Sequence, residues 1–197
     1  MRFGTEAFYA SLGRAFVAMC AVIPVLFLIE AIDLSVGGGG RLDLAGGIIP
    51  RRVDGLDGVL FSPFLHAGWD HLYGNAVPLI LVGTFALAGG ARRFIWSTAV
   101  IMLVSGLGVW IVGSPGTVVV GASGVIFGYA TYLIARGVFN RSGTQLAVGA
   151  AVVLVWGAAL VGGLEPQRGI SWQGHLFGAI GGVVAARVVA RERPVES

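Results

Sequence analysis

A short glycine-flanked serine motif is the part of this sequence best suited to chemistry. Ser123 lies in Gly121-Ala122-Ser123-Gly124, at the head of a long apolar run. Small neighbours let a serine hydroxyl approach a substrate, and flanking glycines allow a sharp turn that exposes backbone N–H groups. The same pattern of small residues also lets two membrane helices pack closely. The motif alone predicts either a nucleophile or a packing contact, and the residues around it must decide.

A second polar group precedes another apolar run. His71 and Asn75 are four residues apart, so both lie on one face of a helix and can point at the same spot. Asp70 is expected to be the N-cap of that helix, where a carboxylate stabilises the free amides and the positive end of the helix dipole. Taken singly, His71 or Asn75 could equally form an interhelical hydrogen bond.

A third polar position, His175, opens the last apolar run. Gly174, Gly178 and Gly182 recur there at a spacing of four, which gives a smooth helix face that a neighbouring helix can approach to backbone distance. A histidine beside such a face is held close to that neighbour. Its imidazole could take the proton of a serine hydroxyl during attack and return it to the leaving amine.

The elements that must position these residues are membrane helices. The chain has 197 residues, of which 56% are hydrophobic and only 12% charged, and this composition is typical of a membrane protein. A helix needs about 20 apolar residues to cross a hydrocarbon core of about 30 Å. Stretches of roughly this length occur at residues 15–34, 71–90, 94–113, 122–139, 144–163 and 174–190. We therefore predict an all-α membrane protein, a six-helix bundle that forms one domain over residues 1–197.

The arginines predict how the bundle is oriented. All thirteen basic residues are arginines, and the net charge of +3 gives no indication of a nucleic-acid partner. With a cytoplasmic N-terminus, nine fall on the inner side: Arg2, Arg14, Arg92, Arg93, Arg136, Arg141, Arg187, Arg191 and Arg193. The outer side receives Arg41, Arg51, Arg52 and Arg168. This asymmetry follows the positive-inside rule and predicts that both termini are cytoplasmic.

The longest loop, from Ser35 to Asp70, admits two interpretations. It begins with glycines at positions 37–40 but also carries many apolar residues. It could be a flexible loop whose amphipathic pieces lie in the outer interface. It could also be a structure that shields or laterally gates a site.

The topology brings the separate motifs together. The second, fourth and sixth predicted spans all run from outside to inside, so their polar residues start three helices on one side of the membrane. Convergence of His71, Asn75, Ser123 and His175 at one depth favours chemistry over packing. These three spans contain no acidic residue. We therefore expect a Ser–His dyad, with an aromatic ring, Phe127 one turn after the serine, orienting the imidazole.

On these motifs the sequence resembles the rhomboid family of intramembrane serine proteases. The motifs are His66-x4-His71-x3-Asn75, Gly121-x-Ser123-Gly124 and His175-x2-Gly178-x3-Gly182. The resemblance implies that Ser123 is the nucleophile, that His175 is its base, and that His71 and Asn75 assist the oxyanion. Backbone N–H groups at Ser123 and Gly124 would contribute there too. His66, Gly121, Phe127, Gly178 and Gly182 would support the site.

Two departures from the family pattern concern the surroundings of the site. Phe127 stands where some members have tyrosine, which removes a hydroxyl but keeps the ring. The Trp-Arg pair often found in the family's first loop is not evident.

The resemblance also implies the partners. Substrates would be transmembrane proteins whose helices can unwind near the outer face of a bacterial cell membrane, since a helical peptide bond is shielded. No cofactor is implied, and no metal, because His66, His71 and His175 lack ligand partners in a shared motif. The alternatives are a catalytically inactive rhomboid-like protein that binds membrane helices, and a small transporter or channel. An inactive relative would lack the serine or histidine, and a transporter would carry ionisable residues at midplane.

Overall fold

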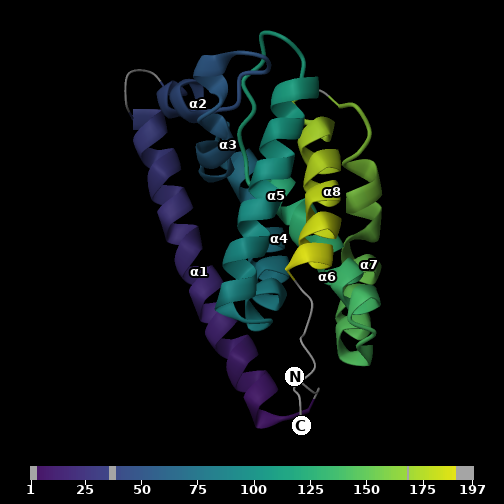
Figure 1. Ribbon diagram of the computed structural model, residues 1–197. Helices are drawn as coiled ribbons and strands as arrows, with labels where there is room; N and C mark the ends of the chain where they lie inside the picture. Colours follow the sequence, from purple (N-terminus) through teal and green to yellow (C-terminus); the bar gives the residue numbers. More distant parts are fainter. Residues whose placement is uncertain (1–3, 36–38, 168, 190–197) are drawn as a thin grey trace.

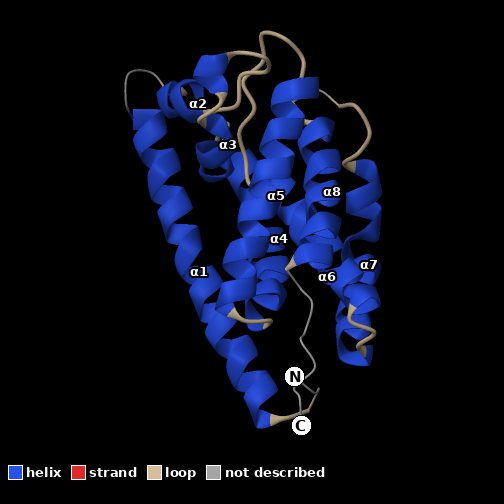
Figure 2. Cartoon of the chain, in the orientation of Figure 1, coloured by secondary structure: helices blue, strands red, loops and turns tan. Residues whose placement is uncertain are grey.

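The computed structural model describes residues 4–35, 39–167 and 169–189 as a bundle of helices (Figure 1). The helices are, in chain order, α1 (Glu6–Ser35), α2 (Arg41–Gly46), η1 (Val53–Gly55), α3 (Gly58–Phe61), η2 (Ser62–Phe64), α4 (Trp69–Ala88), α5 (Ala91–Val112), α6 (Ser123–Phe139), α7 (Gly143–Gly162) and α8 (Trp172–Val188). Figure 2 shows no strand in this described part of the chain. The prediction of an all-α fold is confirmed.

The observed helices follow the predicted spans closely. Helices α4 to α8 begin and end within three residues of the expected boundaries, although the predicted end of the last span, Ala190, lies outside the described residues. Helix α1 begins at Glu6 rather than Ala15, because helix formation continues past the apolar window into more polar sequence. Within the described residues, α1, α4, α5 and α7 are long and apolar enough to cross a membrane, and α6 is a shorter apolar helix. The count of six spans stays a prediction.

Helix α6 forms the centre of the bundle and packs against α4, α5, α7 and α8. Its side chains Tyr129, Tyr132 and Leu133 are almost completely buried. Helix α1 stands at one edge, where α4 is its main neighbour among the long helices (Figure 1). The serine motif therefore opens the helix with the most neighbours, where backbone motion is most restricted.

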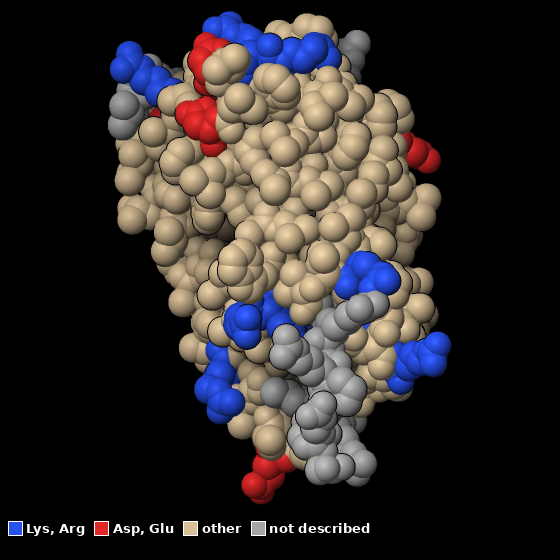
Figure 3. All heavy atoms as spheres, viewed as in Figure 1, with Lys and Arg blue, Asp and Glu red and all other residues tan. Residues whose placement is uncertain are grey.

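The surface has the charge distribution of a membrane protein. Figure 3 shows charged atoms toward the two ends of the molecule and a band of uncharged side chains between them. Large apolar side chains are exposed along α1, α5 and α7, as on Val17, Leu103 and Leu154. A soluble surface would rarely expose so much contiguous apolar area. Four arginines used to predict orientation, Arg2, Arg168, Arg191 and Arg193, lie outside the described residues.

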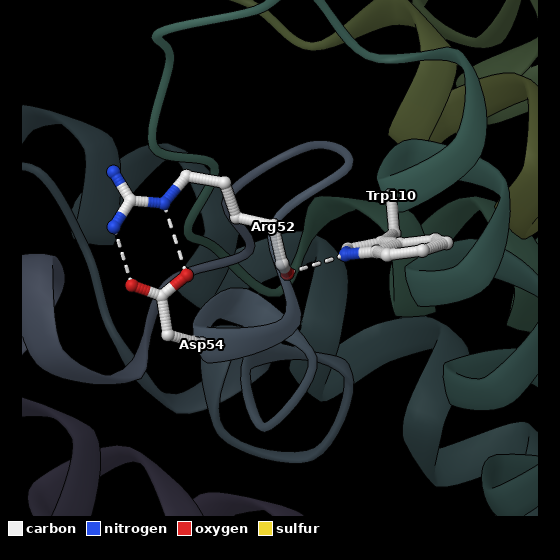
Figure 4. A network of polar contacts seen from close by, with 3 residues as sticks. All are labelled: Arg52, Asp54 and Trp110. Carbon is white, nitrogen blue, oxygen red and sulfur yellow. Dashed lines mark hydrogen bonds and ion pairs between the residues drawn. The ribbon is translucent and has the colours of Figure 1, made fainter.

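Residues 39–68 form a compact cap, here called the loop segment, at one end of the bundle. Figure 4 shows its attachment to α5, where the Trp110 indole N–H donates to the Arg52 carbonyl at 2.7 Å. The Arg52 side chain pairs with Asp54, and the Arg51 N–H donates to the Trp110 carbonyl at 2.9 Å. We call this end of the bundle the loop end.

The loop segment also holds the backbone that leads into the serine motif. Ile48 and Val119 exchange two antiparallel hydrogen bonds of 2.9 Å, and the Gly121 N–H donates to the Ser62 carbonyl at 2.8 Å. The segment thus fixes the position from which α6 starts. Whether it also gates access to the site stays an open prediction.

A carboxylate at the loop end offers a test of this packing. The pKa of Asp43, in α2, is raised to about 6 because burial disfavours its charge and because Asp33 and Glu30 repel it. Because folding raises this pKa, protonated Asp43 stabilises the folded state. The contribution is fully present at pH values below the ordinary pKa of 3.8 and is lost as pH rises through about 6.

Asp43→Asn is therefore expected to raise Tm at pH 8, on the order of 2 °C, and to leave it nearly unchanged at pH 4. Thermal unfolding of the purified proteins at both pH values measures this. Asp54→Asn is the control, because Arg52 lowers the pKa of Asp54 and its charge is favourable. Equal behaviour of the two variants would contradict the expectation.

Candidate active site

The polar residues singled out from the sequence line one cavity of about 340 Å³ near the loop end. Its walls come from α4, α6, α7, α8 and the connector before α8. The predicted residues among them are His71, Asn75, Ser123, Phe127 and His175. The structure thus brings these five together from three helices.

Ser123 is the first residue of α6, and its side chain is half-buried. The preceding residue, Ala122, provides no side-chain cap. The first N–H groups of a helix have no partner within it, so those of Ser123 and Gly124 remain available at the positive end of the helix dipole. Within the described residues the Ser123 hydroxyl makes no hydrogen bond. In resting enzymes the bond between nucleophile and base is often loose and tightens when substrate binds.

His175 is oriented by a backbone carbonyl. Its Nδ1 lies 2.7 Å from the Gly163 oxygen, at the end of α7. A carbonyl only accepts hydrogen bonds, so the proton of the neutral ring is on Nδ1, and Nε2 keeps a free lone pair. Phe127 stacks on the imidazole with the ring centroids 4.1 Å apart and an interplanar angle of 6°. The ring therefore has both a fixed tautomer and a fixed plane.

Gly163 must be small for this arrangement. A Cβ there would lie 2.5 Å from Phe127 Cζ and 3.0 Å from His175 Nδ1. Neighbouring Gly162 has nothing within 4 Å of such a Cβ. The two glycines therefore form a matched pair, one against the site and one in open space.

Gly163→Ala is expected to displace the stacked rings and lower kcat on the order of 10- to 100-fold, the scale of a misplaced reacting group. Gly162→Ala should keep the parent's turnover. Steady-state cleavage of a transmembrane substrate by both variants measures this. Equal activity of Gly163→Ala and the parent would remove the Gly163 contact from the account of the site.

His71 has the opposite tautomer. The Ala67 N–H donates to His71 Nδ1 at 3.3 Å, so in the neutral ring the proton is on Nε2. This nitrogen faces Gly121, where an added Cβ would lie only 2.7 Å away. Gly121 has φ of 116°, a conformation that favours glycine. His71 can therefore donate a hydrogen bond beside the serine motif, whereas His175 can accept a proton there.

Asn75 lies one turn further along α4 and is buried. Its Nδ2 donates to the His71 carbonyl at 2.8 Å. A primary amide has two N–H donors, so one is left for a ligand in the cavity. His71 and Asn75 thus form a pair of donors on one helix face, as their spacing predicted.

The helix that carries them starts two residues earlier than expected, at Trp69 rather than His71. Gly68, with φ of 98°, occupies the N-cap position, and Asp70 lies in the first turn. The prediction that Asp70 is the N-cap was wrong, because a glycine conformation rather than a side-chain cap ends the loop segment. Asp70 still lies near the positive end of the helix dipole.

His66 is buried behind His71 and does not line the cavity. Its ring contacts His71 edge to face, with the centroids 5.2 Å apart. Burial and the proximity of His71 lower the pKa of His66 to about 4. The backbone of Phe64 favours the protonated form of His66, although it makes no hydrogen bond to either ring nitrogen. His66 is therefore neutral at physiological pH and serves as a packing ring for His71.

Glycines bring α6 and α8 to backbone contact. A Cβ at Gly178 would collide with the Gly124 carbonyl, and one at Gly182 with the Gly128 carbonyl. Gly174 has another contact: its carbonyl accepts from the buried Ser105 hydroxyl at 3.0 Å. Ser171 caps α8 by accepting from the Gly174 N–H. The close approach of α6 and α8 holds Ser123 and His175 at the same level of the bundle.

Sequence reasoning missed the groups that act through their backbone. The Gly163 carbonyl and the Ala67 N–H set the two histidine tautomers, and neither has a side-chain signature. Trp156 of α7, which carries no motif that would assign it to the site, also lines the cavity. Within the described residues no group of three His, Cys, Asp or Glu side chains could hold a metal ion.

Comparisons with known proteins agree with this architecture. A family profile described as Rhomboid domain matches residues 55–192. The chain is 44% identical over 177 residues to an uncharacterised protein of Mycobacterium tuberculosis strain H37Rv, covering 85% of this chain and 72% of that protein. It is 37% identical over 182 residues to an uncharacterised protein of Mycobacterium leprae, covering 88% and 71%. The chain therefore belongs to the rhomboid family.

Proposed function

We propose that this protein is an intramembrane serine endopeptidase with a Ser123–His175 dyad. The observation that supports it best is the pair of complementary tautomers in one cavity. His175 presents a free Nε2, and His71 presents an Nε2–H donor. A general base and an oxyanion donor are the two groups that acyl transfer requires besides a nucleophile.

The proposed reaction begins when the Ser123 hydroxyl attacks the carbonyl carbon of the scissile peptide bond. Nε2 of His175 takes the hydroxyl proton as the C–O bond forms. The carbonyl oxygen becomes an oxyanion, which accepts hydrogen bonds from His71, Asn75 and the N–H groups at the start of α6. Collapse of this intermediate breaks the C–N bond, and His175 gives the proton to the departing amine.

Water then completes the cycle. His175 removes a proton from a water molecule, whose oxygen attacks the acyl carbon of the ester on Ser123. The second intermediate breaks its bond to Ser123, and the proton returns to the serine oxygen. The products are the two halves of the substrate chain, one with a new amine and one with a new carboxylate.

The substrate class follows from the position of the cavity. The site lies at the loop end, and in the proposed topology, which the positive-inside rule supports, this end faces the outside of a bacterial cell membrane and both termini are cytoplasmic. A transmembrane helix must unwind there before its carbonyl is accessible. The family resemblance favours small residues at the scissile bond.

A reconstitution experiment tests this function. Purified protein in liposomes is given a tagged transmembrane substrate with small residues near the outer face, and the fragments are identified by mass spectrometry. We expect cleavage near that face and covalent labelling of Ser123 by a fluorophosphonate.

The second candidate function is that of a rhomboid-like protein that binds helices without cutting them. The observation that favours it is that the Ser123 hydroxyl makes no hydrogen bond within the described residues. Such a protein would bind the substrate without producing fragments and without being labelled by the fluorophosphonate.

A further inference from the structure

Helix α1 contacts the start of α4 through one aromatic side chain, Phe27. Its ring stacks on Trp69 with the centroids 5.8 Å apart, and it meets the Tyr73 ring edge to face with the centroids 5.2 Å apart. Aromatic pairs at such separations attract each other beyond what the burial of apolar area provides. Phe27 is half-buried and packs against the hydrophobic core, so its own position is fixed by the bundle.

Trp69 and Tyr73 alternate along α4 with the two proposed oxyanion donors. His71 is two residues from each aromatic residue, and Asn75 is two residues beyond Tyr73. Two residues turn an α-helix by about 200°, so the aromatic pair and the donor pair lie on nearly opposite faces. Phe27 therefore supports the back of the two turns whose front presents His71 and Asn75 to the catalytic cavity.

Helix α1 also supports α4 further along the bundle. A Cβ at Gly83 would lie 2.5 Å from Met19 Cε, and the Ser11 hydroxyl donates to the Ala88 carbonyl at 3.2 Å. Helix α7 shares the catalytic cavity with α4 but does not pack closely against it within the described residues. The tilt of α4 relative to α6, the helix that begins with the proposed nucleophile, therefore depends on α1.

Two carboxylates in the last turns of α1 hold the loop segment at both of its ends. Asp33 accepts hydrogen bonds from the Gly40 N–H at 3.0 Å and from the Leu42 N–H at 2.6 Å. Glu30 is only 1% exposed and lies against the backbone of Gly68, the N-cap of α4. These contacts leave the chain before α4 little freedom, so the aromatic contact of Phe27 acts on a helix whose first residue is already anchored.

We propose that Phe27 is a positioning residue for the proposed protease reaction. By holding the first two turns of α4, it keeps His71 and Asn75 directed at the place where the oxyanion forms. The inference rests on the proposed function, because only attack by Ser123 creates the charge that these donors stabilise. Preorganised groups are sensitive to small displacements, and a shift of about 1 Å caused by a distant change can cost roughly 100-fold in rate. Phe27 itself touches none of the reacting atoms.

Steady-state cleavage of a transmembrane substrate in liposomes tests this role. Phe27→Ala is expected to lower kcat roughly tenfold and to change KM little, because the donors act on the transition state. Phe27→Tyr keeps an aromatic ring and should restore most of the turnover. Leu28→Ala is the matched control, because Leu28 is the next residue of α1 and is 61% exposed. It should keep the kcat of the parent.

A second variant shows whether Phe27 acts through the donors. In an Asn75→Ala background, Phe27→Ala should lower kcat by a smaller factor than in the parent, because one of the groups that it positions is already missing. Hydrogen exchange gives a measurement that does not depend on cleavage. Phe27→Ala should speed amide exchange in the first two turns of α4 and leave exchange at the start of α6 unchanged.

The remaining outcomes separate this role from simple packing and from the proposed function. An equal loss of kcat with and without Asn75 would overturn the inference, and so would unchanged exchange at the start of α4. A lower Tm with normal kcat in the folded fraction would show that Phe27 only packs. Failure of the parent to cleave would overturn the proposed function, whereas normal cleavage by Phe27→Ala beside an active parent would overturn this inference alone.

Discussion

Ser123→Ala is expected to reduce cleavage by at least about 10⁴-fold, because it removes the atom that forms the acyl-enzyme bond. The substitution deletes one hydroxyl that makes no hydrogen bond within the described residues, so the packing of α6 should hardly change. Helicity, Tm and membrane insertion should therefore match those of the parent. Fragment formation in liposomes and fluorophosphonate labelling measure the loss.

Ser114→Ala provides the control for Ser123→Ala. Ser114 lies in the exposed connector after α5 and outside the catalytic cavity. Its loss should leave both cleavage and labelling intact. Comparable turnover by Ser123→Ala and the parent would remove Ser123 as the nucleophile.

His71→Ala and Asn75→Ala are each expected to lower kcat about 100- to 1,000-fold while raising KM far less. The donors act on a charge that exists only in the transition state, in a poorly hydrated site where preorganised dipoles are effective. The available N–H groups at the start of α6 limit the loss from either change. Steady-state kinetics and thermal unfolding on the same preparations measure both effects.

A packing role would give the reverse pattern for these two residues. Tm would fall, and the folded fraction would turn over substrate almost normally. Val77→Ala provides the control, because this exposed side chain on α4 reaches no part of the cavity. Normal kcat in both His71→Ala and Asn75→Ala would remove the pair from the site.

Sequence patterns predicted the helices well because each helix is an apolar run that ends in glycine or in polar residues. They also predicted that Ser123, His71, Asn75 and His175 start helices at one end, since topology alone brings alternate spans to the same level. The stacking partner Phe127 followed from its position one turn after the serine. These expectations depend on periodicity and on side-chain types, which a sequence displays directly.

The missed features depend on backbone groups and on loop geometry. No side-chain pattern indicates that the Gly163 carbonyl accepts from His175 or that the Ala67 N–H donates to His71. Gly68, rather than Asp70, occupies the N-cap position of α4, with a positive φ of 98° that favours glycine. The sequence left open whether the loop segment is flexible or a structure that shields the site, because its bonds to Trp110 and Val119 form only once the chain is folded. Long-range backbone contacts of this kind leave no local trace in the sequence.

The carbonyl behind His175 also determines the resting charge of the site. A carboxylate in that position would bring a formal charge out of water, at a cost of several kcal/mol in a medium of low dielectric constant. The Gly163 carbonyl orients the ring as a neutral dipole and avoids that cost. In the proposed reaction, the same dipole would stabilise the imidazolium formed during attack less than a full negative charge would. We therefore expect a dyad whose uncharged resting state costs little free energy in a low-dielectric environment and whose turnover is slow.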